Sequence, residues 1–160
     1  STLRSSRWVA NEWRSVCGVT WRLLSPAAAD VLVTTSQAAD GYKVVVNVGN
    51  PLDTATKAQV SDLFLKKTAT WSNGVEVEPI DLYPTSDLRE TFSEAVHGRS
   101  VAAVKSYWQR LIFSGEAVPP PEIENEKQVM FWVGSSPGAI GYVSASTPLG
   151  EGVKVLRVTD

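Results

Sequence analysis

The sequence predicts an α/β domain in which a mostly parallel sheet is flanked by helices. Strand-like and helix-like segments alternate along residues 42–158, which is the pattern of a sheet with helices on its faces. The stretch 42–48 is rich in β-branched residues, as expected of a strand that is buried on both faces. The 160 residues, of which 43% are hydrophobic, suffice for one domain with its own core.

Three further strands and four helices follow from the same patterns. The predicted strands cover 76–82, 139–143 and 153–158, with a short additional strand at 31–34. Each predicted helix carries apolar residues at helical spacing, and the ranges are about 57–67, 86–97, 99–115 and 122–133. In the strand 139–143, the glycine at its centre predicts a close approach of another segment.

The segment 75–97 is the predicted working end of the domain. Its strand stops before Pro84, because proline fixes φ and cannot continue a hydrogen-bonded ladder. Ser86 then begins a helix on which Arg89 falls away from the apolar face. Ligands of open α/β sheets bind outside the carboxyl ends of strands, where helix N–H groups are free. The unit is therefore a candidate ligand site, although many such units bind nothing and Ser86 can be explained as an N-cap alone.

Residues 1–29 differ from the rest of the chain. They carry four arginines against Glu12 alone, followed by the small residues Ala27-Ala28-Ala29 before Asp30. Positive charge, a partly apolar stretch and a small-residue cleavage motif favour a signal-like segment. Arg14, Arg22 and Trp21 interrupt its apolar stretch, so an amphipathic helix is the alternative. We expect residues 1–29 to lie outside the core and residues 30–160 to form a single domain.

The sequence offers little material for catalysis. The only cysteine is Cys17 and the only histidine is His97, which at a predicted helix end is better explained as a cation than as a base or ligand. No phosphate-binding glycine loop or dinucleotide fingerprint is present. We therefore expect no enzyme activity, no catalytic residues, no metal and no cofactor. A net charge of −2 argues against a nucleic-acid partner, and no stretch approaches the roughly 20 apolar residues of a membrane span.

Three segments together resemble the periplasmic phosphate-binding proteins of bacterial ABC transporters and their shorter homologues. The first, 47–74, contains Asn50-Pro51, the run DLFLKK and the turn WSNG. The second, 79–92, contains PIDL followed by Ser86 and Phe92, and the third, 136–143, reads SPGAIGYV. The likeness covers about residues 43–144. It implies one lobe of a type II periplasmic-binding-protein fold, with fragments of the second lobe.

The resemblance also implies an anion site. The family binds phosphate through hydroxyls, an arginine and N–H groups at helix N-termini, and such donors suit a dehydrated anion. Ser86 matches the serine of the family's Ser-Gly-Thr loop. The residues expected to line the site are Ser86, Thr85, Arg89 and Asn50.

This sequence departs from the family pattern at three positions. Asp87 and Leu88 stand where the family has glycine and threonine, and Leu82 stands at the place of the anion-binding arginine. Asp87 also puts negative charge beside the expected anion. The resemblance therefore supports the fold more strongly than it supports phosphate as the ligand.

Two functions follow as hypotheses. The first is a non-enzymatic, periplasmic or secreted solute-binding protein for phosphate or another small oxyanion, with an ABC permease as partner. The second is an interaction or sensory domain that keeps the fold without the ligand and acts through another protein or a homodimer. An exposed aromatic patch that includes Trp108 would favour the second hypothesis.

Overall fold

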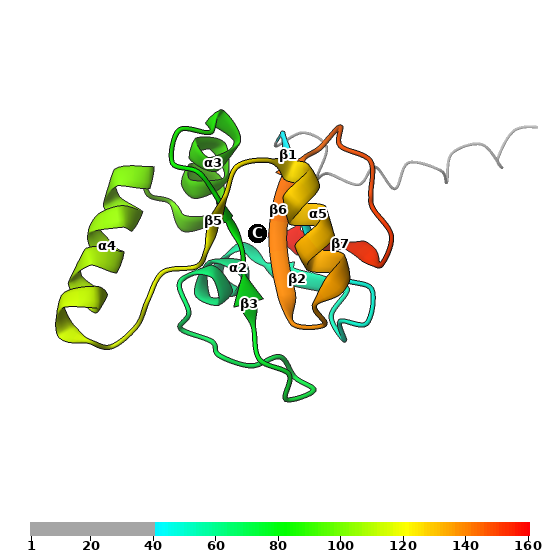
Figure 1. Ribbon diagram of the computed structural model, residues 1–160, viewed down its shortest axis with the longest axis horizontal. Helices are drawn as coiled ribbons and strands as arrows, with labels where there is room; N and C mark the ends of the chain where they lie inside the picture. The colour runs from blue at the N-terminus through cyan, green and yellow to red at the C-terminus, as the bar shows by residue number, and fades with distance from the viewer. Residues whose placement is uncertain (1–40) are drawn as a thin grey trace, which may run out of the picture. The chain divides into compact units, whose positions relative to one another are not determined.

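The computed structural model describes residues 41–160 (Figure 1). The predictions for 1–29, for a strand at 31–34 and for a domain boundary at residue 30 lie outside this range. The strands are β1 (Tyr42–Asn47), β2 (Thr54–Thr56), β3 (Glu78–Pro79), β4 (Asp81–Leu82), β5 (Glu122–Ile123), β6 (Ala139–Ser144) and β7 (Val153–Thr159). The helices are α2 (Lys57–Phe64), α3 (Asp87–Phe92), the π-helix η2 (Ser93–His97), α4 (Val101–Ser114) and α5 (Glu126–Ser135).

The central sheet is mixed, with the order β2-β7-β1-β6-β3. Its longest pairings, β1 with β6 and β1 with β7, are antiparallel, whereas the edge strands β2 and β3 pair in parallel. The sequence predicts a mostly parallel sheet, but the centre of the sheet is antiparallel, because β6 and β7 both run in the opposite direction to β1. The carboxyl end of β1 consequently lies at the opposite end of the sheet from that of β6.

Helix α5 covers one face of this sheet and packs on β6 and β1 (Figure 1). The contact is close at Gly141, where an added Cβ atom would lie 2.6 Å from Cγ1 of Val129. The close approach predicted for the glycine of this strand is therefore confirmed. Val129 and Val133 of α5 are both fully buried against the sheet.

The opposite face is covered by α2 and by the continuous helix α3–η2. Rings from these helices and from the sheet pack together: Phe92 stacks on Tyr142 with 3.8 Å between ring centroids, and both contact Phe64. Tyr42 of β1 meets the edge of Phe92. The predicted apolar positions of the helix 86–97 thus form the centre of the core, since Phe92 and Val96 are buried.

Two predicted elements differ in the structure. The expected strand 76–82 is divided into β3, at the edge of the central sheet, and β4, which pairs with β5 in a separate two-stranded sheet. The expected helix from residue 122 begins at Glu126 instead, because Glu122 and Ile123 are strand residues and Asn125 caps the helix by accepting from the N–H of Gln128. Both differences arise from the pairing of Asp81 with Glu122, two residues far apart in the sequence.

Helix α4 forms a second, small core. Trp108 and Val104 pack on Leu65, so Trp108 is buried and does not contribute to an exposed aromatic patch, the feature that would have favoured the second hypothesis. Gly115 ends the helix in a left-handed conformation, as its position predicts. Large exposed apolar side chains occur elsewhere, chiefly Phe113 at the end of α4 and Phe131 on α5.

Candidate functional site

A hollow of about 450 Å³ lies beyond the carboxyl end of β4. It is bounded by Leu82, by Ser86 before α3, by residues 124–127 at the start of α5, and by Thr147 after β6. Two helix N-termini therefore border the same hollow. The free N–H groups and partial positive charge at such ends favour negatively charged ligands.

Ser86 lies where the sequence predicts it, at the N-cap of α3 and against the hollow. Its side chain makes no capping hydrogen bond, so the role of a simple N-cap does not account for its hydroxyl. By contrast, the N-cap of α5 is used conventionally, because Asn125 Oδ1 accepts from the N–H of Gln128 at 3.0 Å. Thr85 is exposed beside Ser86 and does not line the hollow.

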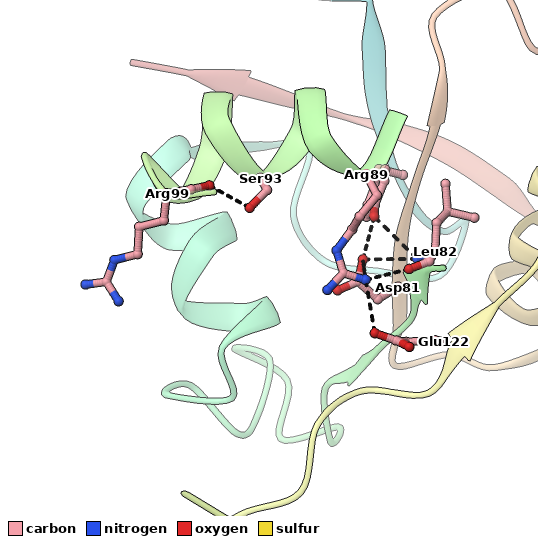
Figure 2. Close-up of polar contacts among 7 residues, drawn as sticks. Asp81, Leu82, Arg89, Ser93, Arg99 and Glu122 are labelled. Atoms are coloured by element: carbon pink, nitrogen blue, oxygen red, sulfur yellow. Dashed lines mark hydrogen bonds and ion pairs between the residues drawn. The ribbon is translucent and has the colours of Figure 1, made fainter. Parts of the chain in front are cut away.

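Arg89 is buried, which contradicts the expectation that it falls away from the core. Only 5% of the residue is exposed, and its guanidinium turns back from α3 to donate to the carbonyl oxygen of Leu82 (Figure 2). Its Nη1 also lies 2.9 Å from Oδ1 of Asp81 and 3.4 Å from Oε1 of Glu122. The guanidinium is thus already paired with two carboxylates of β4 and β5.

Asn50 is separated from the other three candidates. It follows the carboxyl end of β1, at the opposite end of the sheet from Ser86, because β1 runs antiparallel to β6. Its Oδ1 accepts from the N–H of Leu52, and its carbonyl oxygen accepts from Nζ of Lys154 at 2.8 Å. The structure therefore groups Ser86 with Thr85 but does not bring Asn50 to them.

Asp81 is the centre of a buried polar cluster that the sequence reasoning did not identify. The Tyr142 hydroxyl donates to its Oδ1, and the Leu82 N–H lies 3.0 Å from the same oxygen. Burial raises the pKa of Asp81 to about 6, an effect that the charge of Arg89 opposes. Burial and the neighbouring Asp81 carboxylate raise the pKa of Tyr142 as well. An acid inside the apolar run Pro79–Leu82 was the available signal, since a buried carboxylate requires partners.

Charged side chains also border the hollow itself. The carboxylates Glu124 and Glu126 and the ammonium of Lys127 line it, and Asp87 lies in the first turn of α3. Glu126 Oε2 accepts from the N–H of Ser144 at 2.9 Å and from the hydroxyl of Thr147. No local sequence signal could have placed Glu126 with Thr147, because the contact depends on how β6 folds back against α5.

His97 is not a helix-end cation, contrary to expectation. Burial lowers its pKa to about 4, and Arg89, Arg99 and Lys67 act in the same direction, so the ring is neutral at pH 7. Its Nδ1 lies 2.8 Å from Oγ of Ser61, and the ring edge packs on Phe92. A histidine with so low a pKa is a poor general base at neutral pH, and this pair connects α2 to η2.

Residues 41–160 show neither a candidate metal site nor a membrane-spanning helix. No group of three or more histidine, cysteine, aspartate or glutamate side chains in this part of the chain could hold a metal ion. No helix in this part of the chain is long and apolar enough to cross a membrane.

Solved structures of bacterial phosphate receptors have the same fold. An ABC-type phosphate transport receptor from Vibrio cholerae matches with a TM-score of 0.58 and 16% identity, over 74% of this chain and 46% of the receptor. PstS from Borrelia burgdorferi matches with a TM-score of 0.58 and 11% identity, over 74% of this chain and 47% of PstS. The chain therefore spans less than half the length of the structures it matches.

These matches confirm the predicted fold class, an α/β lobe like those of type II periplasmic binding proteins. At such low identities the similarity establishes the fold alone. No family model matches the sequence, and no curated protein matches it.

Proposed function

We propose that this chain supplies one lobe of a non-enzymatic solute-binding protein, with phosphate or a related small oxyanion as ligand. The observation that carries the proposal is the position of Ser86 in a fold shared with phosphate receptors: it begins α3 beside the hollow, with no capping bond of its own. An ABC permease as partner and a periplasmic or secreted location belong to the same proposal.

The donors around the hollow suit an oxyanion. The hydroxyls of Ser86 and Thr147, the ammonium of Lys127 and the N–H groups of two helix N-termini all border it. Hydrogen bonds from such groups to a charged oxygen are roughly twice as strong as those between neutral groups. Glu124 and Glu126 oppose the binding of a dianion, so further donors from a second lobe are part of the proposal.

A thermal-shift titration of the full chain with phosphate and sulfate tests this function. A ligand at 100 times its Kd adds roughly 2.7 kcal/mol of stability, which a melting curve resolves. We expect one of these anions to stabilise the wild type saturably. We expect Ser86→Ala to bind that anion at least tenfold more weakly. Ser106→Ala is the matched control, because this exposed hydroxyl on α4 bonds only within its own helix, to the Ala102 carbonyl. Equal responses of the two variants would contradict the proposed site.

The alternative function is an interaction domain that retains the lobe without a ligand. It is favoured by one observation, the exposure of large apolar side chains at Phe113 (91% exposed) and Phe131 (72% exposed). Absence of any anion response in the titration, together with an intact fold, would support this alternative.

A further inference from the structure

Glu126 lines the hollow and already occupies two hydrogen-bond donors of the turn after β6. Its Oε2 accepts both from the N–H of Ser144 and from the hydroxyl of Thr147. Glu126 is half-buried, whereas its neighbours Glu124 and Lys127 are exposed. One side-chain carboxylate of the chain is thus bound by a backbone N–H and a hydroxyl, the kinds of donor that an oxyanion ligand needs.

These donors are held in place by contacts that do not involve Glu126. The N–H of Thr147 donates to the Ser144 carbonyl at 3.0 Å, and the N–H of Ala145 donates to the Gly41 carbonyl at 3.1 Å. Nζ of Lys43 donates to the carbonyl oxygens of Ala145 and Thr147. The backbone of the turn after β6 is therefore held by contacts with Gly41, Lys43 and Ser144 that do not depend on Glu126.

We propose that Glu126 is a built-in competitor for the hollow: a solute oxyanion binds the Ser144 and Thr147 donors only by displacing the Glu126 carboxylate. The inference rests on the proposed function for the location of the anion. It assigns to that site a control of affinity, because the carboxylate is covalently tethered next to the donors and is favoured by the N-terminus of α5. Solute affinity is then set by how readily this side chain swings out.

The test is calorimetric titration of the full chain with inorganic phosphate at constant ionic strength. Glu126→Ala is expected to bind phosphate at least tenfold more tightly than wild type, because the competing carboxylate is gone while the turn remains. Glu124→Ala is the matched control, since it removes the same charge from the same hollow, and it is expected to tighten binding less than threefold. If phosphate affinity increases equally in the two variants, the loss of one negative charge explains the increase, and the inference is overturned.

Glu126→Asp provides a second variant that keeps the charge. The side chain is one methylene shorter, so it is expected to lose the contact with Ser144 and Thr147 and to bind phosphate more tightly than wild type. Binding in Glu126→Asp that equals wild-type binding, in a protein shown by circular dichroism to be folded, would overturn the inference. This variant also serves if Glu126→Ala fails to fold.

The outcomes separate the inference from the proposed function. Binding by Glu126→Ala but not by wild type supports the competitor role and contradicts phosphate binding by the natural sequence. Binding by wild type that Glu126→Ala does not improve supports the function and contradicts the competitor. Absence of binding in every variant overturns the competitor role.

Discussion

Asp81 and Arg89 form an ion pair that is almost completely removed from solvent. Burying two charges costs free energy, and here the cost is offset by hydrogen bonds from Tyr142 and from the Leu82 N–H to the carboxylate. Arg89, the arginine expected to bind an anion ligand, is therefore already paired with carboxylates of the protein. Its place on α3 could not be deduced from helical spacing, because the guanidinium reaches back past the helix start to β4.

The two shifted pKa values predict opposite pH dependences of stability. The pKa of Asp81 is raised from 3.8 to about 6 on folding, so its contribution to stability is present below pH 3.8 and lost as the pH rises through 6. The pKa of His97 is lowered from 6.5 to about 4, so its contribution is present above pH 6.5 and lost as the pH falls through 4. In the wild type these two slopes oppose each other between about pH 4 and 6.

Removing either group exposes the slope of the other. In Asp81→Asn, the free energy of unfolding is expected to rise with pH between about 4 and 6, relative to wild type, by on the order of 3 kcal/mol. In His97→Gln it is expected to fall with pH relative to wild type. Urea unfolding at a series of pH values measures both, and profiles parallel to the wild type in both variants would contradict the assigned pKa shifts.

Among the candidate residues, the position of Ser86 at the start of a helix was predictable, and the position of Asn50 at the other end of the sheet was not. Ser86 follows from a local pattern, because a strand, a proline turn and an apolar helix face are contiguous in the sequence. Asn50 was expected beside it through the resemblance to phosphate-binding proteins, whose first matched segment contains Asn50-Pro51. The antiparallel course of β1 places Asn50 at the other end, and such long-range direction leaves no trace in the local sequence.

At the scale of elements, the elements with complete local patterns were predicted well. Strands β1, β6 and β7 and helix α4 lie within a residue or two of their expected ranges, since each carries its own periodicity and end signals. The division of 76–82 and the late start of α5 both depend on the pairing of β4 with β5. That pairing joins residues about 40 positions apart, so the local pattern could not contain it.

The connection into β6 requires a glycine at position 138. An added Cβ atom there would lie 1.9 Å from the carbonyl oxygen of Glu76, and the Gly138 carbonyl accepts from the indole N–H of Trp71 at 2.9 Å. Neither backbone can move without loss of the β3–β6 pairing. Gly138→Ala is therefore expected to lower the free energy of unfolding by about 3 kcal/mol.

Gly150→Ala is the control for this substitution. Its added Cβ would make ordinary contact with Met130, with 3.5 Å between the atoms, so a change within about 0.5 kcal/mol is expected. Chemical denaturation of both variants measures the difference. A loss in Gly138→Ala no larger than in Gly150→Ala would contradict the close approach of residues 76 and 138.

At the scale of the whole molecule, residues 41–160 form a lobe that carries the candidate ligand hollow between α3 and α5. It shares its fold with phosphate receptors, and the matched part makes up less than half of each receptor. Residues 41–160 offer the proposed ligand one wall of a site. We therefore expect phosphate to bind this chain more weakly than it binds a complete two-lobed receptor.

Amide NMR of the full chain during phosphate titration tests directly whether the hollow between α3 and α5 binds an oxyanion, with chloride as the control for ionic strength. We expect saturable shifts for Ser86, Asp87 and Lys127 and for the turn at Ser144–Thr147. We expect no saturable shift around Asn50, at the opposite end of the sheet. Saturable shifts at Asn50 and Lys154 instead, or shifts that chloride reproduces, would contradict an oxyanion site in this hollow.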